Sequence, residues 1–195
     1  MAKLYFRYGT MNSGKSTALL QAAYNYEERG MRVLIIKSAV DTKGGAAIVS
    51  RLGTTRNADI LLRHDEPIRA QLDELAARHR LHCVLVDEAQ FLAPEQVEEL
   101  FWFAVEADVP VMAYGLRTDF STKAFSGSPR LLELAHELQE LKTICRCGKK
   151  AVLNGRKIDG KFVTEGGQVA IDDAPNIEYE ALCAADYQRL VRRQA

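Results

Sequence analysis

The segment from residue 9 to residue 16 constrains the fold of this chain more than any other feature. It reads Gly-Thr-Met-Asn-Ser-Gly-Lys-Ser and matches the phosphate-loop pattern G-x-x-x-x-G-K-[ST] at every position. An apolar run at residues 4–8 precedes it, and residues 16–29 have the apolar spacing of a helix. Glycine at both ends lets backbone N–H groups turn inward, and the helix N-terminus adds partial positive charge. The sequence therefore predicts a strand, a phosphate-binding loop and a helix, in that order.

Parts of this loop have distinct predicted roles toward a nucleoside triphosphate. Lys15 is expected to bridge the β and γ phosphates of ATP as a point charge, and the Ser16 hydroxyl to take a position on Mg²⁺. A chance glycine–lysine turn is the alternative, and the strand–loop–helix context argues against it. The predicted nucleotide-binding residues of the loop are Gly9, Thr10, Met11, Asn12, Ser13, Gly14, Lys15 and Ser16.

Apolar runs of strand length alternate with helical patterns along most of the chain. Helical spacing covers residues 67–80 and resumes from Pro94. Strands that alternate with helices predict an α/β fold of the P-loop NTPase type, with a parallel sheet flanked by helices. Besides residues 4–8, the strand-like runs are residues 33–36, 83–86, 109–114 and, less clearly, 141–144.

Residues 38–56 interrupt this alternation. They contain three glycines and have no sustained apolar period. We expect a mobile loop beside the active site, with a disordered connector as the alternative on composition alone.

An acidic pair follows the apolar run that ends at Val86. In a protein with a phosphate loop, an Asp at the end of a neighbouring strand holds Mg²⁺, usually through water, which is the role expected of Asp87. Glu88 projects to a different side and can act as general base on an attacking hydroxyl or water. A pair of solvated acids is the alternative, favoured if the phosphate loop were absent. The pair leaves kinase and ATPase chemistry both open, because a carboxylate positions water as readily as a sugar hydroxyl.

Composition sets the broad class of the protein. The chain has 195 residues, of which 47% are apolar, and its 26 basic residues balance 26 acidic ones. A globular chain of this length buries about 70% of its unfolded surface. Zero net charge argues against a general binder of nucleic acid or membranes, which needs a basic surplus. Without a targeting signal or a membrane-spanning apolar window, a cytoplasmic location with reduced thiols is expected.

Three of the four cysteines suggest a metal site. Cys145 and Cys147 are separated by one residue, and Cys183 follows 36 residues later. Thiolates in this pattern favour tetrahedral Zn²⁺, which needs a fourth ligand. Asp186 is the preferred candidate because it follows Cys183 by three residues in a helical first turn, and His136, in another helical pattern, is the rival. Unrelated free thiols remain the alternative for the whole cluster.

The surroundings of these cysteines indicate a second compositional zone. Short β-like pieces at residues 151–153, 161–164 and 169–171 are separated by glycines, and residues 184–193 form a terminal helical pattern. We therefore expect a phosphate-loop domain over residues 1–143 and a small zinc-ribbon domain over residues 144–195. Cys83 lies inside an apolar run and is expected to be an inert core residue.

Taken together, these features resemble the thymidine kinases shared by most bacteria and the animal cytosol. The resemblance spans residue 1 to about residue 193. Many families share the phosphate loop, so the combination of segments in this order makes the resemblance specific. The segments that carry it are residues 8–17, 86–91 (Val-Asp-Glu-Ala-Gln-Phe), 114–120 (Tyr-Gly-Leu-Arg-Thr-Asp-Phe) and 141–145 with the cysteine knuckle.

The resemblance implies an ATP:thymidine 5′-phosphotransferase. It makes the first domain, residues 1–143, a kinase domain and gives the second, residues 144–195, a substrate lid, or lasso. Such an enzyme uses Mg²⁺, accepts thymidine or deoxyuridine, and gives dTMP for nucleoside salvage. Glu88 matches the family's general base, which accepts the 5′-hydroxyl proton. Inhibition by dTTP, a homotetramer and a structural zinc that braces the substrate loop are implied as well. Beyond the phosphate loop, the implied nucleotide-binding residues are Asp87, Glu88, Ala89 and Gln90.

The resemblance also implies how the nucleoside is held. Three residues match positions that line the thymine pocket, one matches a tyrosine near the base, and residues 168–171 match a loop that binds largely through its main chain. For the aromatic and leucine side chains, core packing is the interpretation that composition alone favours. The implied substrate-binding residues are Met11, Leu116, Phe120, Gln168, Val169, Ala170, Ile171 and Tyr179.

Two features depart from the family pattern. Asp186 stands where the family usually has Cys or His, and Asp172-Asp173, with Pro175 close by, stand where it tends to have a glycine pair. The fourth zinc ligand and the shape of the lid loop therefore do not follow from the resemblance.

Arg117 or Lys43 is a weaker candidate for assisting the transition state of phosphoryl transfer, because each lies in an otherwise polar segment.

Two other functions compete with a nucleoside kinase. An ATPase acting on nucleic acid predicts hydrolysis stimulated by DNA or RNA, and the neutral charge argues against it. A non-catalytic nucleotide sensor predicts tight binding without turnover, and the presence of Glu88 and Lys15 argues against that.

Overall fold

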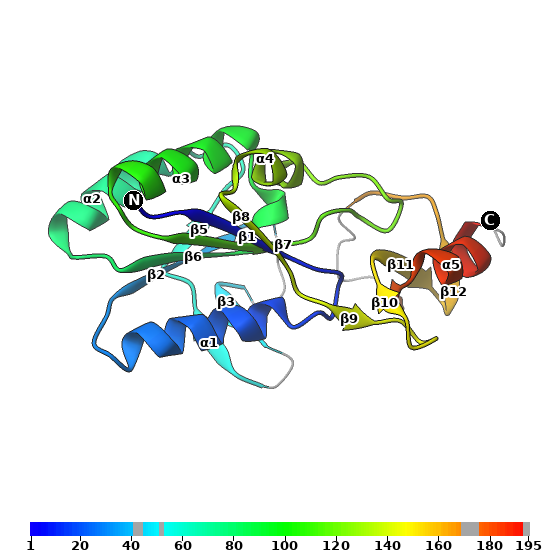
Figure 1. The fold of residues 1–195 in the computed structure, drawn as a ribbon. Coiled ribbons are helices and arrows are strands. Elements are labelled where there is room, and N and C mark those ends of the chain that lie inside the picture. Colours follow the sequence, from blue (N-terminus) through cyan, green and yellow to red (C-terminus); the bar gives the residue numbers. More distant parts are fainter. Residues whose placement is uncertain (41–44, 51–52, 169–175, 193–195) are drawn as a thin grey trace.

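A six-stranded sheet forms the centre of the molecule (Figure 1). The computed structural model describes residues 1–40, 45–50, 53–168 and 176–192. Every pairing in this sheet is parallel, which confirms the predicted α/β fold class. In sheet order, the strands are β5 (Ile60–Leu62), β2 (Val33–Ser38), β6 (Cys83–Asp87), β7 (Val111–Gly115), β1 (Leu4–Tyr8) and β8 (Glu137–Glu140).

Helices cover both faces of the sheet because alternate strand residues point to opposite sides. In β2, Leu34 and Ile36 pack in one apolar cluster, together with residues of α2, α3 and α4. Val33 and Ile35 pack in the other cluster, together with residues of α1. The helices are α1 (Lys15–Glu27), α2 (Arg69–Arg78), α3 (Pro94–Glu106) and α4 (Gly127–Leu134).

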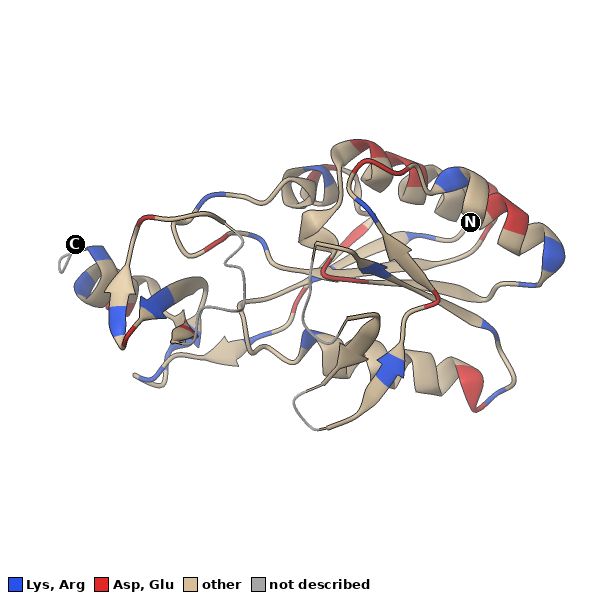
Figure 2. Ribbon diagram, turned by 180° about the vertical axis from the view of Figure 1, so that it is seen from behind, with Lys and Arg blue, Asp and Glu red and all other residues tan. Residues whose placement is uncertain are grey.

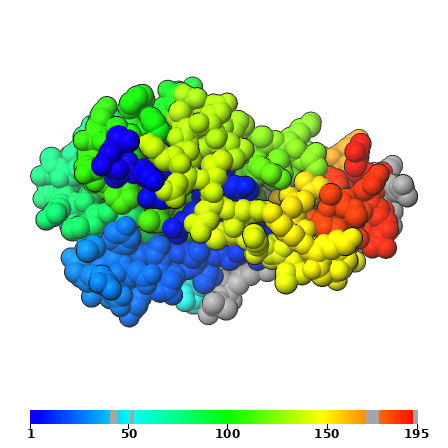
Figure 3. Space-filling view, viewed as in Figure 1, coloured from blue at the N-terminus to red at the C-terminus, as the bar shows by residue number. Residues whose placement is uncertain are grey.

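From residue 143 onward the chain forms small sheets at one end of the molecule, yellow to red in Figures 1 and 3. Their apolar cluster is small and includes Cys145, Leu182, Cys183 and Tyr187. The elements are β9 (Thr143–Ile144) with β10 (Lys150–Ala151), β11 (Leu153–Ile158) between β12 (Lys161–Val163) and β13 (Ile177–Leu182), and α5 (Ala184–Tyr187), which continues as a π-helical turn over Gln188–Arg192.

The predicted sheet strand at residues 141–144 is wrong. The edge strand is β8, and residues 143–144 belong to β9 instead. An edge strand needs few apolar side chains, and three of the four residues of β8 are exposed, so it leaves no apolar run in the sequence. The short strand β5 at the opposite edge also escaped prediction.

The segment at residues 38–56 is more regular than expected. Its described parts form a hairpin of β3 (Ala47–Val49) and β4 (Thr55–Asn57). Ile48 is buried and belongs to the same apolar cluster as residues of α1, so the described parts of the segment are not a structureless connector. Lys43 lies outside the described residues.

The surface carries both signs of charge. Figure 2 shows Lys and Arg interspersed with Asp and Glu on the helices and on the C-terminal strands. In the described ranges, no helix is both long and apolar enough to cross a membrane.

Candidate functional site

The phosphate loop connects β1 to α1, as the sequence predicted. Asn12 and Gly14 have positive φ angles of 69° and 79°, which Asn and Gly adopt more readily than other residues. A Cβ atom at Gly9 would lie 2.3 Å from Ser13 Oγ and 2.7 Å from the Leu141 carbonyl oxygen. The loop therefore folds too closely on itself for any residue but glycine at position 9.

Polar groups of the loop are suited to an anionic ligand. The buried hydroxyls of Thr10 and Ser13 make no hydrogen bond within the described part of the protein. No side chain caps the N-terminus of α1, and its first turn contains no acidic residue. Lys15 is 8% exposed, and its Nζ donates to the Thr10 carbonyl over 3.0 Å. Because buried donors without partners are costly, phosphate oxygens fit this set of groups.

The ends of three parallel strands lie level at one edge of the sheet. Tyr8, the last residue of β1, pairs with Gly115 of β7. Val86 of β6 pairs with Ala113 of β7, so Glu88 comes level with Gly115. The phosphate loop and the acidic pair therefore leave the sheet side by side across β7.

The two carboxylates have different surroundings. Asp87 is 3% exposed and lies opposite Lys37 of β2. Glu88 is half-buried and has φ 50° and ψ 40°. This left-handed conformation is uncommon outside glycine and is found often at functional sites. It turns the chain at Glu88 out of the strand direction, so the two side chains project differently, as the sequence predicted.

Asn154 of β11 joins the C-terminal strands to the phosphate loop. It is 3% exposed; its Oδ1 accepts from the Met11 backbone N–H over 2.8 Å, and its Nδ2 donates to the Thr118 carbonyl over 3.1 Å. Since one partner only donates and the other only accepts, the orientation of the amide is fixed. A crevice at this junction is lined by Tyr8, Gly9, Thr10, Arg117, Thr118, Glu140, Val152 and Asn154.

Arg156 lies two residues further along β11 and therefore on the same face. It is 3% exposed, and its guanidinium carbon lies 3.5 Å from the centre of the Phe120 ring. Its Nη1 donates to the Gly167 carbonyl over 2.8 Å and its Nη2 to the Glu165 carbonyl over 3.0 Å. A Cβ atom at Gly166 would lie 2.2 Å from Nη2. Arg156 thus links Phe120 to the loop that precedes residue 168.

Several residues predicted to hold a nucleoside are near this face. Phe120 is 2% exposed, and its carbonyl accepts from the Tyr187 hydroxyl over 2.6 Å. Leu116 is also buried, and Met11 is half-buried beside Asn154. One face of the Phe120 ring is therefore covered by the Arg156 guanidinium.

The remaining predicted nucleoside contacts belong to the C-terminal part of the chain. Tyr179 stands opposite Arg156 in the β11–β13 pair, so the two side chains share one face of this sheet. Gln168 is exposed, and its Nε2 donates to the Ala124 carbonyl over 2.9 Å. Val169, Ala170 and Ile171 lie outside the described residues, as do Asp172, Asp173 and Pro175.

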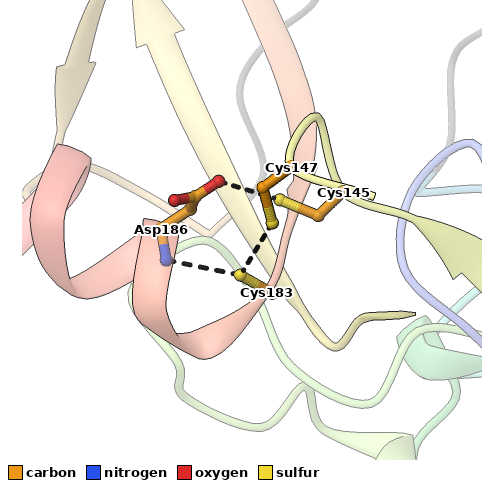
Figure 4. A group of neighbouring side chains, drawn as sticks. All are labelled: Cys145, Cys147, Cys183 and Asp186. Carbon is orange, nitrogen blue, oxygen red and sulfur yellow. Dashed lines mark hydrogen bonds between the residues drawn. The ribbon is translucent and has the colours of Figure 1, made fainter. Parts of the chain in front are cut away.

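Four predicted metal ligands come together in the C-terminal region (Figure 4). One ligand atom from each of Cys145, Cys147, Cys183 and Asp186 lies within 4.8 Å of the other three. Cys147 and Cys183 Sγ are 3.5 Å apart, and Cys145 Sγ is 3.2 Å from Asp186 Oδ2. A tetrahedral site with metal–sulfur bonds of about 2.3 Å has edges of about 3.8 Å, so the four groups fit one Zn²⁺ ion.

His136 is held elsewhere. Its Nδ1 accepts from the Leu4 backbone N–H over 3.1 Å, and its ring stacks on Phe101. It follows the end of α4 rather than lying within a helix, which corrects the helical pattern expected there. The geometry therefore favours Asp186 over His136 as the fourth ligand.

Sequence reasoning missed Asn154 and Arg156. Their only signal is two polar residues at alternate positions in a strand-like segment, which a solvated strand face would also give. Only the tertiary contacts reveal that both side chains are buried.

Comparison with known proteins identifies the family. A family model described as "Thymidine kinase" matches residues 2–187. The chain belongs to the thymidine kinase family. The resemblance inferred from the sequence is thereby confirmed.

Curated thymidine kinases are similar to the chain over nearly its whole length. That of Ruegeria pomeroyi is 50% identical, over 94% of this chain and 92% of that protein. That of Shewanella oneidensis is 45% identical, over 98% of this chain and 99% of its own. That of Enterobacteria phage T4 is 47% identical, over 99% of each.

Proposed function

We propose that this protein transfers the γ-phosphoryl group of ATP to the 5′-hydroxyl of thymidine, and also of deoxyuridine, to give the nucleoside 5′-monophosphate. Family membership supports the substrate. The observation that carries the chemistry is the level position of the ends of β1 and β6 on either side of β7. This places a phosphate loop and a carboxylate at one edge of the sheet, where the two substrates can meet.

In this proposal the phosphate loop holds ATP. Loop N–H groups and the Thr10 and Ser13 hydroxyls donate to phosphate oxygens, and Lys15 supports the charge of the transferring group. Ser16 and Asp87 would hold Mg²⁺, which neutralises charge on the β and γ phosphates when bound. A hydroxyl and a carboxylate are suitable oxygen ligands for this ion.

Glu88 is the general base of the reaction. Its carboxylate takes the proton from the 5′-hydroxyl as the oxygen–phosphorus bond forms and the bond from the γ-phosphorus to the bridging oxygen breaks. ADP leaves with the electron pair of that bond. Because Glu88 is half-buried rather than enclosed, an incoming hydroxyl can reach it.

The nucleoside lies against the face formed by the C-terminal strands and the segment after β7. We assign it to Met11, Leu116, Phe120 and Tyr179, together with the main chain of residues 168–171. Apolar contact with the 5-methyl group would favour thymine over uracil by about 1–3 kcal/mol, so both are substrates.

Zinc holds the C-terminal region together in this proposal. Cys145, Cys147, Cys183 and Asp186 would bind it as a structural ion with three sulfur ligands and one oxygen ligand. We further propose a division into a kinase domain, residues 1–143, and a zinc-ribbon domain, residues 144–195. A homotetramer, feedback inhibition by dTTP and a cytoplasmic location without nucleic-acid or membrane partners complete the proposal.

One assay tests the function. Purified protein is incubated with Mg-ATP and a panel of nucleosides, and the 5′-monophosphates are separated and counted. We expect product from thymidine and deoxyuridine and little from purine nucleosides. ATP hydrolysis that ignores thymidine but rises with DNA or RNA would overturn the proposal.

A further inference from the structure

The side chain of Gln90 has an unusual position next to the acidic pair. It lies in the 3₁₀ turn Ala89–Phe91 that follows Glu88, and it has no exposed surface. Its Nε2 donates to Glu88 Oε2 over 2.5 Å, and its Oε1 accepts from the Leu116 backbone N–H over 3.0 Å. One buried amide thus connects the end of β6 with the end of β7.

The orientation of this amide is determined by its partners. The Leu116 N–H can only donate, so the amide oxygen must face it, and the NH₂ group must then face Glu88. Gly115 makes room for this arrangement, because a Cβ atom there would lie 2.8 Å from Gln90 Oε1. The Glu88 oxygen that faces Gln90 therefore has to accept a hydrogen bond, which an ionised carboxylate does well.

We propose that Gln90 is a positioning residue for Glu88, and that it reserves Glu88 Oε2 so that Oε1 receives the proton of the nucleoside 5′-hydroxyl. This rests on the proposed function, in which Glu88 is the general base. The bonds made and broken are those of that reaction, and the proton goes to Oε1. Because the side chain of Gln90 has no exposed surface, this role differs from the direct nucleotide contact that the family resemblance implied.

The same amide also connects the general base, Glu88, to the segment proposed to hold the nucleoside. Leu116 begins the segment that carries Phe120, and its N–H is held by the group that holds Glu88. A small displacement of a reacting group costs about 10²-fold in rate, so fixing both elements with one side chain favours a productive geometry.

The test replaces Gln90 without changing its shape. Q90E keeps an oxygen for the Leu116 N–H but replaces the donor to Glu88 with a second oxygen. We expect kcat for thymidine to fall about 10- to 100-fold, while the KM values for ATP and thymidine change less than about threefold. Q96E is the matched control, because Gln96 is also buried and bridges backbone groups away from the sheet edge. It should leave kcat within about twofold.

A double-mutant cycle separates positioning from a structural effect. If Gln90 acts through Glu88, Q90E causes no further loss in kcat in an E88Q background. Q90E with unchanged kcat, or with equal losses in both backgrounds, overturns the proposal. If Q90E does not fold, G115A, which displaces the amide without removing it, should lower kcat in the same pattern, and normal turnover by G115A overturns the proposal. Wild-type protein that fails to phosphorylate any nucleoside would instead refute the proposed function.

Discussion

The two ends of this molecule are stabilised in different ways. Around the parallel sheet, two large apolar clusters fill the space between the strands and the helices on both faces. From residue 143 onward, one small cluster remains, and two of its members are the predicted metal ligands Cys145 and Cys183. The first region therefore has far more apolar burial to support its fold than the second.

The difference explains how the site is divided. The sheet presents the phosphate loop and Glu88, which need a fixed geometry. The C-terminal strands approach that edge through buried polar groups, namely Asn154 on the phosphate loop and Arg156 on Phe120. In the proposed function, the nucleoside side of the site therefore depends on a region that a zinc ion would stabilise.

Of the changes considered, removal of the metal should produce the largest difference in stability between the two regions. Metal binding supplies on the order of 10 kcal/mol of folding free energy in small zinc modules. A chelator should remove the hydrogen-exchange protection of β11 and β13 while β1, β6 and β7 stay protected. Loss of protection in both regions together, or in neither, would contradict the comparison.

Single substitutions test which residues bind the proposed zinc. C147S should lower the zinc content measured by elemental analysis, whereas C83A should not, because Cys83 lies in the sheet core. D186A should weaken zinc affinity by more than the roughly 10- to 100-fold typical of residues that only support a ligand, and D186C should restore it. Full zinc affinity in D186A would exclude Asp186 as a ligand.

Replacing Arg156 should have the next largest effect on the stability of the protein. R156K keeps the charge, but lysine cannot donate to both carbonyls and lie flat on Phe120. We expect it to lower the free energy of unfolding of the zinc-loaded protein by about 1.5–3 kcal/mol and to raise the KM for thymidine. R146K is the control, since Arg146 is 48% exposed and pairs with Glu180 at the surface. Equal effects of the two variants would show that Arg156 does not link the regions.

Asn154 should contribute less because its two hydrogen bonds involve neutral groups. N154A leaves the Met11 N–H and the Thr118 carbonyl without their partner, so urea unfolding should show a loss of about 1–2 kcal/mol. N176A, which removes an exposed side chain bonded to Asp159, is the control and should change little. If N154A were as stable as N176A, the proposed role of Asn154 in joining the C-terminal strands to the phosphate loop would be contradicted.

The effect that is smallest near neutral pH concerns the sheet core alone. Burial raises the pKa of the Cys83 thiol from its ordinary 9.0 to about 12. The folded protein therefore keeps this proton more tightly than the unfolded chain, and stability falls as pH rises between about 9 and 12. C83A should flatten that part of the pH dependence of urea unfolding. An unchanged slope would show that Cys83 does not contribute it.

Much of the sheet region was predictable from sequence. The buried strands β1, β2, β6 and β7 appear as apolar runs because helices cover both of their faces. The phosphate loop is equally visible because its chemistry demands specific residues at fixed spacing. The edge strands escaped prediction because β5 is short and β8 is largely exposed. Helix α4 was predicted only as a helical pattern around His136, which lies beyond its end.

The C-terminal part of the site was harder to predict. The cysteine spacing predicted a metal site, and the fold brings Asp186 rather than His136 to the three cysteines. The roles of Asn154 and Arg156 arise only when β11 packs against distant segments. Such contacts depend on tertiary structure and leave no periodic pattern in the sequence.

The most direct test of the account is turnover by E88Q. This substitution preserves the shape of the side chain but removes the oxygen charge that accepts the proton. We expect formation of thymidine 5′-monophosphate to fall by about two to four powers of ten, while ATP binding stays within about threefold of wild type. Near-normal turnover in E88Q would contradict the assignment of Glu88 as the base.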